Sequence, residues 1–232
     1  TTTTTTTKPK QTSTTTTTVP FTNYKTYTLR SLEMFLEVGF SVDNQITRLN
    51  PSDGTLYIST NGNEDEGLDN YVKTIPLLFN ELDLNINMEY INSDSSFNID
   101  EIEIWYTNDG YTNEQLEART CNSSWAITYK IKWDYSNQRW NRKAVQVNVC
   151  VAGVGFPEKK AWTLQGITKM LGFIEFESSS EYAGYGGFLQ PKFAKTKQLW
   201  NEDDKLLIQI LYDPRVYEGM TKDEFKEVFK IP

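Results

Sequence analysis

From Leu29 onward, apolar residues recur at spacings typical of helices or of strands. Spacings of three and four residues predict helices at Leu29–Gly39, Leu68–Leu82, Tyr111–Arg119, Glu158–Leu171, Glu202–Tyr212 and Lys222–Phe229. Short apolar runs and alternation predict strands at Ile46–Leu49, Thr55–Ser59, Asn85–Ile91, Glu101–Tyr106, Trp125–Trp133 and Ala144–Val151. Pro76 lies inside the second predicted helix and should kink or break it. We therefore expect an α/β (α+β) fold, with one domain in which helices pack against a mixed, twisted sheet.

The first 20 residues differ in composition from the rest of the chain. They contain 13 threonines and almost nothing apolar, so burial cannot offset the entropy that ordering would cost. We expect residues 1–20 to be a disordered linker or stalk and residues 21–232 to be the folded domain. The tract could act as a spacer, have no role, or add as a strand to a neighbouring copy of the chain.

The charge balance excludes several classes of function. The chain of 232 residues carries 23 Lys and Arg against 31 Asp and Glu, for a net charge of -8. This acidic balance disfavours binding to nucleic acid or to anionic lipid. No apolar stretch is long enough to span a bilayer. The chain has no histidine, which excludes an imidazole base and a His-ligated zinc.

The two cysteines, Cys121 and Cys150, both flank predicted strands. A disulfide between them would close a loop of about 30 residues and stabilise the fold by about 3 to 4 kcal/mol. We expect this bridge because the Thr-rich tract is typical of exported proteins, where disulfides persist. Two buried thiols are the alternative.

The most specific segment is Trp162–Pro214, which reads WTLQGITKMLGFIEF, a glycine-rich loop, then GFLQPKFAKTKQLWNEDDKLLIQILYDP. It resembles the C-terminal half of matrixin-like zinc proteases of the metzincin clan, which have an HExxHxxGxxH helix, a Met-turn and a closing helix. With the tail LYDPRVYEGMT, it is even more similar to domain of unknown function 2927, a family of mostly exported bacterial proteins with a degenerate helix motif. The resemblance implies a zincin-like fold over about the last 70 residues.

Residue by residue, the resemblance assigns the altered motif positions. They are Gln165 at the first His ligand, Gly166 at the catalytic Glu, Lys169 at the second His, Gly172 at the turn glycine, Glu175 at the third ligand and Leu189 at the Met-turn. An amide is a weak zinc ligand, an ammonium repels a cation and glycine cannot act as a general base. The resemblance therefore implies a pseudo-metalloprotease that is not an enzyme, with no cofactor and no metal.

Two arrangements of Lys169 are open. Its ammonium could form an ion pair with Glu175 across the former cleft, or it could extend into solvent. In either case Leu164, Ile167, Thr168 and Leu171 should form the buried face of this helix.

Acidic residues raise two further possibilities. The loop Asn61–Gly67 partly resembles the start of a calcium-binding EF-hand loop, but lacks its twelfth-position Glu. We expect a solvated acidic loop there. Glu101 and Glu103 share a strand face, and paired acids can hydrolyse glycosides. Nothing in the sequence marks either glutamate as a buried acid, so we do not expect hydrolase activity.

Aromatic residues identify a candidate binding rim. Trp133 and Trp140 flank a predicted hairpin turn, and Tyr182 and Tyr185 lie in the glycine-rich loop. Indole faces stack on sugar rings, so glycan binding through the hairpin is one hypothesis; core packing and a plain connecting loop are the alternatives.

Together these features predict a non-catalytic, extracellular or cell-surface domain that binds a protein or a glycan. Strand addition to a sheet edge would let it hold an extended polypeptide. One alternative is a structural subunit that self-assembles through its Thr-rich segment. Another is a metal-dependent hydrolase that uses carboxylates.

Overall fold

The computed structural model describes residues 24–61, 66–92, 100–107, 127–136, 139–150, 155–190 and 197–232. These residues form a mixed α/β fold around a five-stranded sheet with the strand order β2-β1-β3-β5-β4. The strands are β1 (Thr55–Asn61), β2 (Asn87–Tyr90), β3 (Glu101–Thr107), β4 (Ile127–Ser136) and β5 (Arg139–Cys150). The predicted fold class, a mixed sheet packed by helices, is confirmed.

Four strands are parallel, and β4 runs antiparallel at one edge. In the register, Ile58 pairs with Ile102, which in turn pairs with Val145. All three side chains are fully buried, as expected where strand positions of equal parity form one apolar face. A register shift between Lys132 and Trp133 marks a bulge near the hairpin end of β4.

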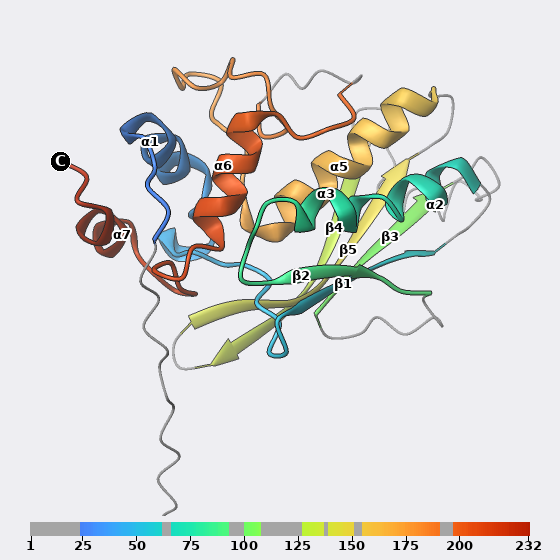
Figure 1. Cartoon of the computed structure of the whole chain (residues 1–232), viewed down its shortest axis with the longest axis horizontal. Helices are drawn as coiled ribbons and strands as arrows, with labels where there is room; N and C mark the ends of the chain where they lie inside the picture. The colour runs from blue at the N-terminus through green and yellow to red at the C-terminus, as the bar shows by residue number, and fades with distance from the viewer. Residues whose placement is uncertain are drawn as a thin grey trace, which may run out of the picture.

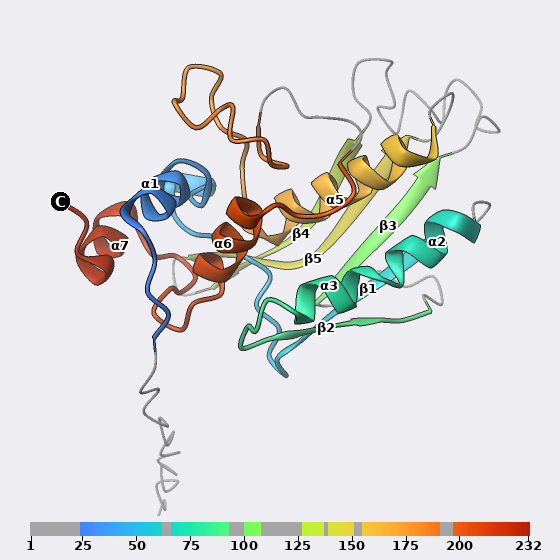
Figure 2. The same cartoon turned by 45° about the horizontal axis from the view of Figure 1, so that its top comes forward.

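Helices cover this apolar face (Figures 1 and 2). They are α1 (Leu29–Val38), α2 (Glu66–Val72), α3 (Ile75–Asn80), α5 (Phe156–Gly172), α6 (Glu202–Leu211) and α7 (Lys222–Phe229), with a 3-10 turn at Val42–Asn44. The helix α5 crosses the sheet over β4 and β5, while α1, α6 and α7 gather beyond its C-terminal end.

Side-chain caps explain where several helices begin. Thr28 accepts a hydrogen bond from the backbone N–H of Ser31 at the start of α1, and Asn201 and Thr221 complete capping boxes with Asp204 and Glu224. Each cap satisfies backbone N–H groups that the first turn of a helix leaves without a partner.

Two predicted elements differ in the structure. The helix expected over residues 68–82 is broken: α2 ends at Val72 and α3 begins at Ile75, with Pro76 in its first turn, where its missing N–H costs nothing. The strand predicted at Ile46–Leu49 is wrong. Only isolated bridges form nearby, from Gln45 to Thr221 and from Leu49 to Arg142, because this segment threads between helix ends instead of along a strand.

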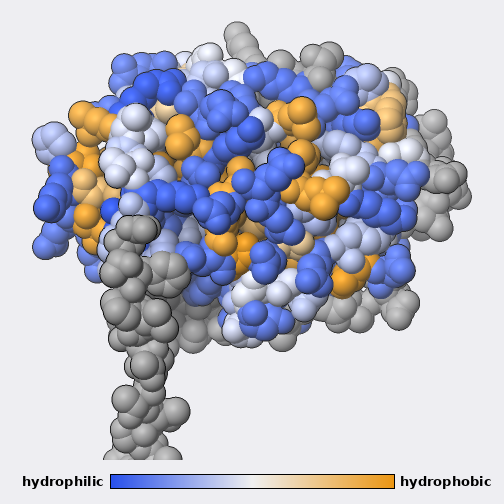
Figure 3. Space-filling view, viewed as in Figure 1, coloured by the Kyte–Doolittle hydropathy of each residue, from blue (hydrophilic) through white to orange (hydrophobic). Residues whose placement is uncertain are grey.

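Several predictions fall outside the described residues. They concern the Thr-rich tract at 1–20, the helix at Tyr111–Arg119, the bridge partner Cys121 and most of the acidic loop that begins at Asn61. Within the described part of the chain, no helix is both long and apolar enough to cross a membrane. The face in Figure 3 is mostly hydrophilic, with separate apolar patches.

Candidate functional site

The helix α5 carries the first altered motif positions on its buried side. Gln165 is 7% exposed, and its Nε2 donates a hydrogen bond to the carbonyl of Phe188 at 3.2 Å. Gly166 is buried beside it. The Gln165 amide therefore ties α5 to the loop that carries Phe188, and Gly166 offers no carboxylate to activate water.

Lys169 and Glu175 form the ion pair that was one of the two arrangements open from the sequence. Their side chains are 18% and 42% exposed. The resemblance aligns Lys169 with the second ligand position and Glu175 with the third. The carboxylate of Glu175 neutralises the ammonium of Lys169. Together these residues offer a closed cation–anion pair instead of lone pairs directed at a metal.

Gly172 allows the chain to turn sharply at the end of α5. Its φ is +155°, and a Cβ at this position would lie 2.6 Å from the carbonyl oxygen of Thr47. Only glycine fits such a close approach. The next residue, Phe173, donates its backbone N–H to the carbonyl of Lys169 at 3.0 Å, which fixes the loop that carries Glu175.

Leu189 is fully buried under α5. Its backbone N–H donates to the hydroxyl of Tyr185 at 2.6 Å, and its carbonyl accepts from the N–H of Phe176 at 2.9 Å. The turn at Leu189, the position that the resemblance aligns with a Met-turn, is thus a packed part of the core.

Asp204 organises the same loop from the first turn of α6. Its carboxylate accepts hydrogen bonds from the Tyr185 hydroxyl at 2.8 Å, from the Phe188 N–H at 2.9 Å and from the Asn201 N–H at 3.1 Å. Burial raises the pKa of Asp204, although these donors pull it down. Burial also raises the pKa of Tyr185 well above its usual range.

The four aromatic residues of the candidate rim lie in different surroundings. Tyr182 donates to Glu33 of α1 at 3.0 Å, and Tyr185 is tied to Asp204. Trp133 is 36% exposed on β4, and the guanidinium of Arg142 lies 5.6 Å from its ring centre. Trp140 pairs in register with Tyr135 near the hairpin end. The structure therefore separates the loop tyrosines, which hold the loop to α1 and α6, from the hairpin.

The described residues contain no group of three or more Cys, Asp or Glu side chains arranged to hold a metal ion. Glu101 and Glu103 are 0% and 2% exposed. Each accepts a hydrogen bond from β1, Glu101 from Ser59 and Glu103 from Asn61 at 3.1 Å. Sequence alternation placed both glutamates on one face, but it did not predict their burial.

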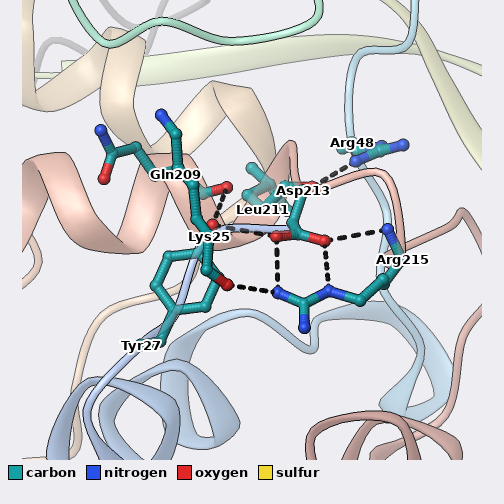
Figure 4. Close-up of polar contacts among 7 residues, drawn as sticks. All are labelled: Lys25, Tyr27, Arg48, Gln209, Leu211, Asp213 and Arg215. Atoms are coloured by element: carbon teal, nitrogen blue, oxygen red, sulfur yellow. Dashed lines mark hydrogen bonds and ion pairs between the residues drawn. The ribbon is translucent and has the colours of Figure 1, made fainter. Parts of the chain in front are cut away.

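The tail motif LYDPRVYEGMT holds the two ends of the described chain together (Figure 4). Asp213 is 3% exposed, and Arg215 donates to both oxygens of its carboxylate, from Nε at 2.8 Å and from Nη2 at 2.9 Å. Tyr27 also donates to Asp213, at 3.1 Å, while Nη2 of Arg215 donates to the carbonyl of Lys25 at 2.8 Å. We call Lys25, Tyr27, Asp213 and Arg215 the terminal clamp.

The second half of the motif holds the segment after α1. Ile46 donates its N–H to the carbonyl of Met220 at 3.0 Å, and Gly219 donates to the carbonyl of Ile46 at 2.8 Å. Both halves of the motif therefore hold distant segments of the chain in place. No role for these residues was predicted from the sequence, although an Asp-Pro-Arg run after a helix is a signal for local pairing.

Two buried arginines close the C-terminal ends of helices. Arg142, on β5, donates from Nη1 to the carbonyls of Lys169 at 2.9 Å and Met170 at 3.0 Å in α5. Arg48 donates to the carbonyl of Leu211 at the end of α6. Burial lowers the pKa of Arg142 to about 10. A positive charge at a helix C-terminus is favourable, so both arginines position the helices that frame the altered motif.

Comparison of the chain with known protein families gives no match, and comparison with curated proteins also gives none. The resemblance to domain of unknown function 2927 and to the metzincins stays a prediction.

Proposed function

We propose that this chain is a non-catalytic binding domain that acts outside the cell or at the cell surface, on the scaffold of a degenerate zincin-like protease. The observation that carries the proposal is the Lys169–Glu175 ion pair. It fills two of the three ligand positions with charges that satisfy each other. The remaining position, the first, holds Gln165, whose amide donates to the carbonyl of Phe188. Proteolytic chemistry has no base and no metal ligand set at these positions.

The ligand we propose is an extended polypeptide that adds as a strand to β4. This strand is 10 residues long, and within the described residues it pairs only with β5. Among these residues, the backbone N–H and C=O groups along its other edge therefore have no strand partner. Such an edge pairs readily with another extended chain, which gains main-chain hydrogen bonds without any special sequence.

The absence of catalysis is tested on the purified, dialysed chain. Zinc is measured by elemental analysis, and labelled casein is offered as a general substrate. We expect far less than about one zinc per chain, the stoichiometry of a catalytic site, and no cleavage of casein. Stoichiometric zinc that survives dialysis, or casein cleavage by a homogeneous sample, would support the metal-dependent hydrolase instead.

Strand addition is tested by fluorescence anisotropy with labelled peptides about ten residues long, the length scale of a strand. Three peptides of alternating apolar and polar residues carry neutral, acidic or basic polar positions. The matched control is the same set with alternate backbone nitrogens methylated, which removes donors but keeps the side chains. We expect at least one peptide to bind and its methylated form to bind at least about tenfold more weakly. Equal binding of the two forms would rule out strand addition.

A further inference from the structure

The hairpin of β4 and β5 has a charge opposite to the rest of the chain. Residues 127–150 contain five basic residues and one acid, a net charge of +4. The other residues contain 18 basic against 30 acidic side chains, a net charge of -12. Salt screens charges beyond about 8 Å, so a ligand that lies on the hairpin senses its local positive charge more than the distant acids.

From this hairpin we propose that the polypeptide bound at β4 is acidic. This inference rests on the proposed function and names the class of partner. On the hairpin, Lys132 and Trp133 of β4 are exposed and Lys143 of β5 is half-buried. Lys132 and Trp133 are consecutive on β4, so their side chains lie on opposite faces of the strand, and an added strand would run past both.

The same lysines disfavour pairing between two copies of β4. Like charges that face each other across two strands destabilise the pair, and lysines on an edge strand are a common protection against self-association. Acidic side chains on an added strand would instead lie near the ammonium of Lys132. The edge therefore selects an acidic strand over another copy of itself.

Trp133 adds an apolar contact on the other face of β4. Arg142 packs against its ring at 5.6 Å while donating to the end of α5, so the indole has a fixed support. A rigid aromatic next to exposed cations is a common combination in surfaces that bind polypeptides. The hairpin ends of β4 and β5 also extend away from the helical layer (Figure 1).

A polypeptide fits these observations better than an anionic glycan. Both would be attracted by the lysines, but only a polypeptide can also pair with the backbone groups of an edge strand. The two ligand classes therefore differ in one measurable respect, the dependence on backbone N–H donors.

The test uses the full chain, the three peptides described above and a heparin fragment. We expect the acidic peptide to bind at least about tenfold more tightly than the neutral one at low salt, with the difference shrinking as salt rises. The variant Lys132→Glu should weaken acidic-peptide binding about tenfold and leave neutral-peptide binding within about twofold. Its matched control is Lys226→Glu, the same charge change at an exposed position on α7, which should change neither by more than about twofold.

Each outcome separates the two proposals. If neutral and acidic peptides bind equally and methylation weakens both, strand addition stands and the preference for acid is wrong. If Lys226→Glu weakens binding as much as Lys132→Glu, the attraction comes from overall charge and the assigned surface is wrong. Binding of heparin without binding of any peptide overturns both proposals in favour of a glycan. Binding of none of these probes overturns both as well.

Discussion

The carboxylate of Asp213 accepts two hydrogen bonds from the guanidinium of Arg215, which lies only two positions later in the chain. The pair also connects segments that are far apart in the sequence, because Arg215 donates to the carbonyl of Lys25 and Asp213 accepts from Tyr27. Arg215 lies 4.9 Å from the ring centre of Tyr24 and 4.4 Å from that of Phe229. A single pair thereby joins the start of the described chain to α6 and α7.

Loss of the Asp213 carboxylate should therefore destabilise the fold. The variant Asp213→Asn leaves Arg215 without its anion, and we expect a loss of about 3 kcal/mol in the free energy of unfolding, measured with urea at neutral pH. The control is Asp203→Asn, which removes the half-buried carboxylate that pairs with the exposed Arg30 at 2.9 Å. That variant should cost less than about 1 kcal/mol. Equal losses in the two variants would mean that the terminal clamp adds no special stability.

Acid should remove the contribution of this pair. Burial alone would raise the pKa of Asp213, but hydrogen bonds and charge from Arg215 hold it below its usual value. A depressed pKa contributes stability that is present above the pKa of an unfolded Asp, about 3.9, and is lost as pH falls through the folded value. The difference between the urea midpoints of wild type and of Asp213→Asn should therefore become smaller below about pH 4. A gap that stays constant down to acid unfolding would contradict this.

Glycine is required at position 172 and not at position 184. The variant Gly172→Ala places a Cβ 2.6 Å from the carbonyl oxygen of Thr47, and we expect a loss of at least about 2 kcal/mol in thermal or urea unfolding. A Cβ added at Gly184 would meet no heavy atom within 4 Å, so Gly184→Ala should stay within about 0.5 kcal/mol of wild type. Similar stabilities of the two variants would disprove the tight contact.

Restoring histidines at the three altered positions tests the proposed relation to zincins. The variant Gln165→His/Lys169→His/Glu175→His should bind about one zinc per chain, because two positions four apart on α5 and one after the turn can converge. The control carries Gln165→His/Lys169→His with Glu175→Ala and should bind zinc roughly tenfold more weakly or worse, since it lacks the third ligand. A folded triple variant that binds no more zinc than this control would argue against the scaffold.

Local sequence patterns predicted the elements whose structure is determined by residues close together in the sequence. The helix around Gln165 begins and ends within two residues of the predicted limits, because its apolar spacing and glycine stop are local. The Lys169–Glu175 pair was also among the expected arrangements, since six residues separate its members. Pro76 marked a break because its effect on a helix is local.

Features that depend on distant segments were not predictable in the same way. No sequence pattern marked Arg48 or Arg142 as buried, yet the ends of α6 and α5 give their guanidinium groups buried acceptors. Glu101 and Glu103 are buried although their alternation with Ile102 and Ile104 predicts that the glutamates lie on an exposed face. Ile46–Leu49 has a strand-like composition, yet its neighbours come from α5, β5 and the tail, so no continuous ladder forms.

The terminal clamp has a mechanical consequence for a domain carried on an N-terminal tether. Tension applied through the first 23 residues would enter at Lys25 and Tyr27 and pass through Arg215 and Asp213 into α6. The contacts of the terminal clamp include no residue of the hairpin that carries Lys132 and Trp133. A ligand gripped there would feel little distortion when the tether is pulled.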